Sequence, residues 1–165
     1  KEILKFQCGP LALAVGGKGA ADWVYAEGTF FHPWELAATL SDFEQQVAGK
    51  RKQLTAWYDD IYHCDKQRPT IEKQFDPEVR VESVDIPEKV ASLRQYIQTE
   101  GPFDVVVAFS QGCIMHHYLV GILRKEQEAM PWQLSVFFEG MHIRDQAYFD
   151  LFATKSPLRT IHVFG

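Results

Sequence analysis

Short runs that are mostly apolar at successive positions constrain this fold more than any other feature. They lie at residues 23–26, 103–109, 134–138 and 160–164, and they are rich in β-branched and aromatic side chains. A strand with one face in water alternates apolar and polar residues, whereas a strand buried on both faces does not. The runs therefore predict strands of a parallel sheet that is covered on both faces.

Residues 86–100 carry the pattern of an amphipathic helix. Asp85 and Glu88 have the spacing of a capping box, Pro87 sits in the first turn, and Gly101 follows the last helical position. We expect this helix to bury one stripe of side chains, formed by Ile86, Val90, Leu93 and Ile97.

The remaining segments predict further helices and a loop. Residues 111–126 are apolar on more than one face, which is typical of a central helix packed beneath other elements. Apolar residues between 36 and 61 recur at spacings of three, four or seven and predict one or two helices. Residues 63–84 are polar and predict a loop. Strands that alternate with helices predict an α/β fold, a three-layer sandwich around a mostly parallel sheet.

Composition narrows the class of protein. A chain of 165 residues with 46% hydrophobic and 24% charged side chains fits one soluble globular domain. The net charge of −5, without a basic stripe, argues against nucleic acid as a partner. No apolar stretch is long enough for a membrane span, and no signal peptide is visible. Cys8, Cys64 and Cys113 lack C-x-x-C spacing, so we expect reduced thiols in a cytoplasmic protein and no zinc site.

Ser110 stands where a predicted strand ends and a predicted apolar helix begins. This is the context of a nucleophile elbow, G-x-S-x-G, in which a tight strand-to-helix turn presents the serine hydroxyl. The turn needs small residues two before and two after the serine, and these are Ala108 and Gly112. With Phe109 leading into it, the motif predicts Ser110 as a nucleophile and the backbone N–H of Gln111 as a donor to an oxyanion.

Five stretches around and beyond this motif share one family pattern. They are G-P-F-D-V-V-V-A-F-S-Q-G-C at 101–113, C-G-P-L at 8–11, W-V-Y-A-E-G at 23–28, S-V-F-F-E-G at 135–140 and T-I-H-V-F-G at 160–165. Together they resemble the FSH family of serine hydrolases. The resemblance implies an α/β-hydrolase fold, a Ser-His-Asp triad with Ser110 as its serine, and hydrolysis of a carboxylic ester or thioester. It implies no metal and no organic cofactor, and a small-molecule ester or acyl substrate.

The chain departs from that family pattern at both ends. Family members begin with a strand that ends in L-H-G, and no His-Gly pair occurs here. Their triad aspartate and histidine follow the strand that matches 160–165, so we expect both partners of Ser110 beyond Gly165. We interpret residues 1–165 as a single α/β-hydrolase domain without the family's first strand and its C-terminal part.

Other interpretations of Ser110 stay open. A triad within the chain is one, because acids and histidines follow the serine in the required order; they are Glu139, Asp145 and Asp150, with His142 or His162. A catalytically inactive binding or scaffold module that keeps the serine as a relic is another. A peptidase-like or lysophospholipase-type hydrolase that shares F-S-Q-G is a third.

Side chains near the motif have structural as well as functional interpretations. His116 and His117 are adjacent on the predicted helix and diverge by about 100°, so they cannot bind one metal ion in the i, i+4 manner. We expect one to pack internally and the other to meet solvent, and we expect Cys113 to pack against the sheet. Three aromatic residues either line an acyl pocket or cover the core: Trp34, Trp57 and Tyr58.

Overall fold

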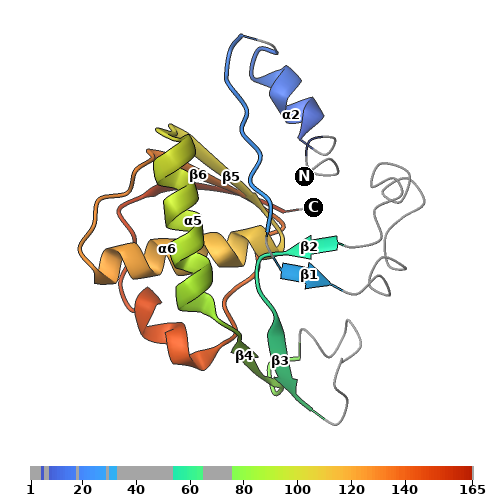
Figure 1. The fold of residues 1–165 in the computed structure, drawn as a ribbon, viewed down its shortest axis with the longest axis vertical. Coiled ribbons are helices and arrows are strands. Elements are labelled where there is room, and N and C mark those ends of the chain that lie inside the picture. The colour runs from blue at the N-terminus through green and yellow to red at the C-terminus, as the bar shows by residue number, and fades with distance from the viewer. Residues whose placement is uncertain are drawn as a thin grey trace. The chain divides into compact units, whose positions relative to one another are not determined.

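The computed structural model describes residues 5, 8–17, 19–28, 30–32, 54–64 and 76–164. The chain divides into two compact units, Lys1–Ala56 and Trp57–Gly165, and each is described by itself. Figure 1 shows the helices and strands of both units. That residues 1–165 form a single domain stays a prediction.

The described part of the first unit contains a short helix and a two-stranded ladder. Helix α2, Gly9–Ala14, has a proline in its first turn, where the missing N–H of proline breaks no helical hydrogen bond. Strand β1, Phe30–His32, pairs antiparallel with β2, Leu54–Ala56.

The apolar run at residues 23–26 does not form the strand that its composition predicts. Residues 22–28 are all described and belong to no strand. Trp23 and Tyr25 nevertheless stack their rings, with centroids 6.3 Å apart. A strand needs a hydrogen-bonding partner as well as suitable side chains, and a sequence pattern reports only the side chains.

The second unit contains a parallel sheet of three strands among its described residues. Strand β5, Val105–Phe109, pairs with β6, Leu134–Phe138, and β6 pairs with β7, Arg159–Val163. All three strands were predicted, with ends that differ by one or two residues. Strand β6 alternates fully buried with half-buried side chains, whereas β7 is exposed along its whole length. The prediction of burial on both faces is therefore wrong for β7, and it is also wrong for β5 at Val105 and Phe109, which are 45% and 41% exposed.

A β-hairpin occupies part of the region predicted to be helix and loop. Strand β3, Asp60–His63, pairs antiparallel with β4, Arg80–Ser83. The spacing of apolar residues up to Ile61 predicted a helix, but Ile61 is 49% exposed and belongs to no buried stripe. The helix prediction is wrong for residues 54–61, and the loop prediction is wrong for β4. Residues 33–53 lie outside the described residues.

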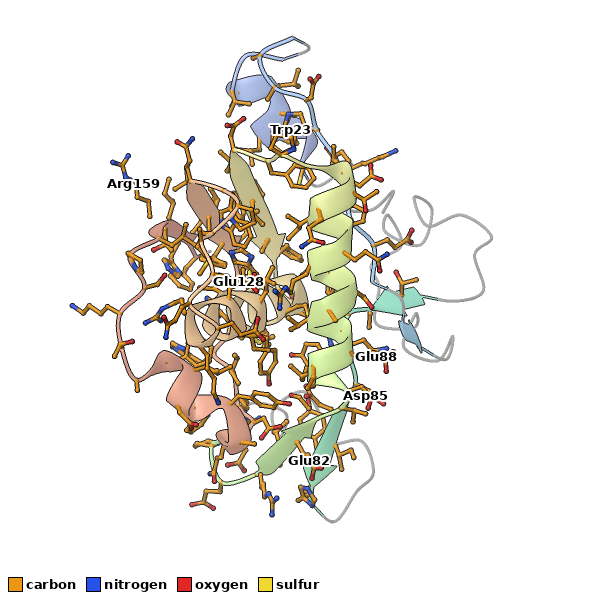
Figure 2. All side chains as sticks on the ribbon, turned by 60° about the vertical axis from the view of Figure 1, so that its left-hand side comes forward. Trp23, Glu82, Asp85, Glu88, Glu128 and Arg159 are labelled. Carbon is orange, nitrogen blue, oxygen red and sulfur yellow. The ribbon has the colours of Figure 1, made fainter. Side chains whose placement is uncertain are left out.

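Helix α5, Ile86–Glu100, has the predicted start and end. Its buried stripe is confirmed, with Leu93 only partly buried. The capping box is wrong, because Asp85 has a φ of 56° and its side chain makes no capping hydrogen bond. Figure 2 shows Asp85 at the junction between β4 and α5, with Glu88 in the first turn of the helix. Only two residues join β4 to α5, and this short connection accounts for the left-handed backbone there.

Helix α6, Gln111–Lys125, is the central helix of the second unit, as predicted. It contacts β5, α5 and the 3-10 helix η2, Gln146–Phe152. Nine of its fifteen residues are buried, and six of these are among the twelve buried residues of the main hydrophobic cluster in the described part. An ion pair at 2.6 Å between Arg94 of α5 and Glu126 joins the two helices at the surface. The position of α6 sets where β5 must turn, because the helix begins one residue after the strand ends.

The core position of α6 predicts a large effect of truncating Leu119. The side chain is 0% exposed, so Leu119→Ala should lower the free energy of unfolding by about 2–5 kcal/mol. Ile161→Ala, at a side chain that is 49% exposed, should change it by less than about 0.5 kcal/mol. Urea-induced unfolding followed by circular dichroism measures both. Similar effects of the two substitutions would contradict this placement of α6.

Candidate active site

Ser110 is the single residue between the end of β5 and the start of α6. Its backbone has φ 49° and ψ −120°, a conformation that favours glycine over any residue with a Cβ atom. A non-glycine residue held in such a region costs about 1–3 kcal/mol and persists only where the surrounding structure fixes it. This sharp, strained turn from strand to helix has the geometry of a nucleophile elbow.

Backbone hydrogen bonds on both sides hold the turn. The Ser110 N–H donates to the carbonyl of Phe138 at the end of β6, over 3.1 Å. The Ser110 carbonyl accepts from the N–H of Cys113, over 2.9 Å. The Cys113 side chain is 0% exposed and packs with Ala108 and Phe137 between helix and sheet, as predicted for packing. Burial raises the pKa of the Cys113 thiol to about 11, so a thiolate is disfavoured there.

The Ser110 hydroxyl is not used to cap the helix that it precedes. Serine is a preferred N-cap residue because its side chain can accept from a backbone N–H in the first turn. Here the side chain makes no capping hydrogen bond, and the residue is half-buried. The N–H of Gln111, the first helical residue, has no partner within the helix, and the positive end of the helix dipole lies at the same place. The hydroxyl of Ser110 and a backbone N–H without a helical partner thus belong to adjacent residues.

The Gln111 side chain joins the elbow to a distant segment of the chain. Its Oε1 accepts from the backbone N–H of Trp57 at 3.0 Å, and its Nε2 donates to the carbonyl of Tyr58 at 3.0 Å. The carboxamide therefore pairs with the backbone on both of its polar atoms. The sequence pattern predicted a role only for the backbone of Gln111, because no local pattern indicates a bond across 53 or 54 residues.

The elbow glycine lies against an indole ring. A Cβ atom added to Gly112 would stand 3.4 Å from Nε1 of Trp57, and no other atom of the described residues beyond its chain and helix neighbours would come within 4 Å. A Cβ atom at this position would thus stand at ordinary van der Waals contact with the Trp57 ring.

Tyr58 is part of the core and does not line a pocket. It is 1% exposed, and its ring meets that of Tyr118 edge to face at 5.9 Å. Burial raises the pKa of the Tyr58 phenol far above its usual value. Tyr118 donates its hydroxyl hydrogen to Ser83 at 2.9 Å, and Ser83 donates to Asp60 at 2.7 Å. Of the three aromatic candidates, Trp57 alone lies beside the elbow in the described part, since Trp34 falls outside it.

Asp145 has a structural role. Its Oδ2 accepts from the N–H of Ser83 at 2.9 Å, and its Oδ1 accepts from the N–H of Ala147 at 2.9 Å, capping η2. A carboxylate that orients a catalytic histidine needs one of these oxygens for the ring N–H. Both carboxylate oxygens of Asp145 accept from backbone N–H groups. Asp145, a candidate acid for a triad within the chain, therefore has other hydrogen-bond partners.

The histidines of α6 are packed among aromatic rings. His116 is 3% exposed, and its Nε2 lies 2.8 Å from Oγ of Ser135. The half-buried His117 packs on Phe137, with ring centroids 4.7 Å apart. Desolvation lowers the pKa of His116 to about 3 and that of His117 to about 4. The expectation that one histidine packs internally is confirmed for His116, while His117 is half-buried. The described residues hold no group of three or more metal-ligating side chains.

Comparison with known proteins decides the family. A family model described as "Serine hydrolase (FSH1)" matches residues 2–165. The chain belongs to the FSH1 family of serine hydrolases. The parallel sheet flanked by helices agrees with the α/β-hydrolase fold of the FSH1 family.

A curated relative also matches part of the chain. "Family of serine hydrolases 3" of Saccharomyces cerevisiae is 35% identical over 89 residues, which are 50% of this chain and 34% of the relative. The match thus spans about a third of the relative's length. No solved structure matches. No helix in the described part of the FSH1-family chain has the length and apolarity that crossing a membrane requires.

The backbone strain at Ser110 predicts an unusual order of stability. Ser110→Gly should unfold with a free energy about 1 kcal/mol higher than Ser110→Ala, because alanine keeps the strained Cβ and glycine does not. Elsewhere in a helix or strand the order is the reverse. Chemical denaturation of both variants measures the difference. A more stable alanine variant would contradict the left-handed conformation.

The buried histidines predict a loss of stability in acid. Between about pH 6.5 and pH 3–4 the unfolded chain binds a proton at His116 and at His117, while the folded chain keeps both rings neutral. The free energy of unfolding should therefore decrease as the pH falls through this window. NMR of the imidazole protons should show both rings neutral down to about pH 5. Titration of either ring near its ordinary value of 6.5 would contradict the burial.

Proposed function

We propose that the protein hydrolyses a carboxylic ester or thioester through an acyl-serine intermediate on Ser110. The observation that supports this most directly is the backbone of Ser110, φ 49° and ψ −120°, between a parallel strand and a buried helix. Strain of this kind is kept at functional sites, where it fixes the direction of a reacting side chain. Membership of a serine hydrolase family supports the same role.

The first step of the proposed reaction forms the acyl-serine. The Ser110 oxygen attacks the carbonyl carbon, and a histidine takes the hydroxyl proton while an aspartate holds that ring in the right tautomer. The carbonyl oxygen becomes an oxyanion that accepts from the N–H of Gln111, and the dipole of α6 stabilises its charge. The alcohol or thiol leaves with the proton that the histidine returns to it.

The second step releases the acid and restores the serine. Water gives a proton to the same histidine and attacks the acyl carbon, so that the oxyanion forms again at the same donor. Collapse of this intermediate breaks the bond to Ser110, which recovers its proton. The acyl group of the substrate passes Trp57, whose ring lies against Gly112.

We also propose that the protein works in the cytoplasm. Cys8, Cys64 and Cys113 are all free thiols, and thiols stay reduced in that compartment.

The proposed nucleophile predicts covalent labelling at one residue. A fluorophosphonate probe should modify the protein at its natural length, and peptide mapping should place the adduct on Ser110. Ser110→Ala should abolish labelling and lower ester hydrolysis by at least about 10³-fold. Ser92→Ala, at an exposed serine of α5, should leave both unchanged. Hydrolysis that survives Ser110→Ala would contradict Ser110 as the nucleophile. Absence of both labelling and hydrolysis in the unsubstituted protein would favour an inactive binding module.

A further inference from the structure

We propose that the Gln111 carboxamide is a positioning group that holds Trp57 beside Ser110, where its indole contacts the acyl group of the substrate. The inference rests on the proposed function and adds to it an apolar acyl group of several carbons as the substrate class. The inference is based on three features that lie together. They are the two hydrogen bonds of the Gln111 side chain with the Trp57 N–H and the Tyr58 carbonyl, which we call the clamp, the partly exposed indole of Trp57, and Gly112.

The clamp fixes the backbone on which Trp57 is carried. Gln111 accepts from the Trp57 N–H and donates to the Tyr58 carbonyl, both at 3.0 Å, so the peptide segment cannot slide or rotate without losing a bond. The next residues are held as well, since Tyr58 is 1% exposed and Asp60 accepts from Ser83. The segment is thus fixed at Trp57, Tyr58 and Asp60, and the Trp57 side chain packs against the core cluster.

That place is next to the reacting serine. The indole Nε1 would contact a Cβ atom on Gly112 at 3.4 Å, and Gly112 follows Ser110 by two residues. Two residues span at most about 7 Å of chain. An acyl group bound to Ser110 therefore reaches the ring within a few carbon atoms. The ring is half-buried, which leaves part of its apolar surface open to a ligand.

Gln111 is the residue type that this clamp requires. One side-chain atom must accept and another must donate at the same time, which a carboxamide does and an ionised carboxylate does not. A protonated carboxyl group also does both. The variant Gln111→Glu should therefore keep the clamp in its protonated form and lose it when ionised, because the carboxylate repels the Tyr58 carbonyl.

The test compares acyl-chain preference in the protein at its natural length. The measured quantity is the ratio of kcat/KM for p-nitrophenyl octanoate to that for the acetate, in which pH effects common to both esters cancel. Gln111→Met should lower the ratio about tenfold at every pH, the scale of lost methylene contacts. Gln111→Glu should lower the ratio near neutral pH, and the ratio should recover as the pH falls through the pKa of the introduced carboxyl. The unsubstituted protein should show no such change.

Controls separate the clamp from general loss of structure. Gln98→Met and Gln98→Glu, on the exposed face of α5, should leave the ratio unchanged. Trp57→Ala should lower the ratio as Gln111→Met does, and the double variant should show no further loss, because Gln111 acts through Trp57. Thermal unfolding identifies variants that are not folded, and acid rescue of Gln111→Glu requires a folded protein.

Two kinds of negative result have different meanings. An unchanged ratio in folded Gln111→Met, or additive effects of the two substitutions, would overturn this inference and leave the proposed function intact. Absence of Ser110-dependent hydrolysis in the unsubstituted protein would overturn the proposed function and the inference with it.

Discussion

Helix α6 is buried along nine of its fifteen residues, and the rest of the second unit is arranged around that burial. The helix contacts β5, α5 and η2, so its start cannot move away from the sheet. Strand β5 ends one residue earlier, and the chain must therefore reverse direction over Ser110 alone. The hydrogen bonds of Ser110 with Phe138 and Cys113 hold this turn. Packing energy of the helix thus maintains a backbone conformation that serine alone would avoid.

Local sequence and burial agree in most of the elements that were predicted correctly. Helices α5 and α6 bury the residues that their patterns select, and every residue of β6 is buried or half-buried. Strand β5 is exposed at both ends and β7 along its whole length, although both were predicted as strands. Strand β3 reverses this relation, because Ile61 is exposed while Asp60 accepts a hydrogen bond from Ser83. The helix prediction is wrong here because it counted Ile61 as part of a buried stripe. Asp85 fitted a capping box by residue type, but its backbone is left-handed and its side chain makes no capping hydrogen bond.

The candidate site was predicted in its local part only. The positions of Ser110 and Gln111 follow from a strand, a short turn and a helix that are contiguous in the sequence. The bonds of the Gln111 side chain reach a segment more than fifty residues earlier and depend on how α6 packs. The two backbone bonds of Asp145 depend in the same way on β4 and η2. Such contacts follow from tertiary packing and leave no local pattern.

The central claim is that the turn between β5 and α6 makes Ser110 a nucleophile. The most direct test is to trap the intermediate, by mixing the protein at its natural length with a chromogenic ester and quenching within one turnover. The account predicts that the peptide containing Ser110 gains the mass of the acyl group faster than steady-state turnover proceeds. Hydrolysis without any acylated peptide, or an acyl group carried on another residue, would contradict it.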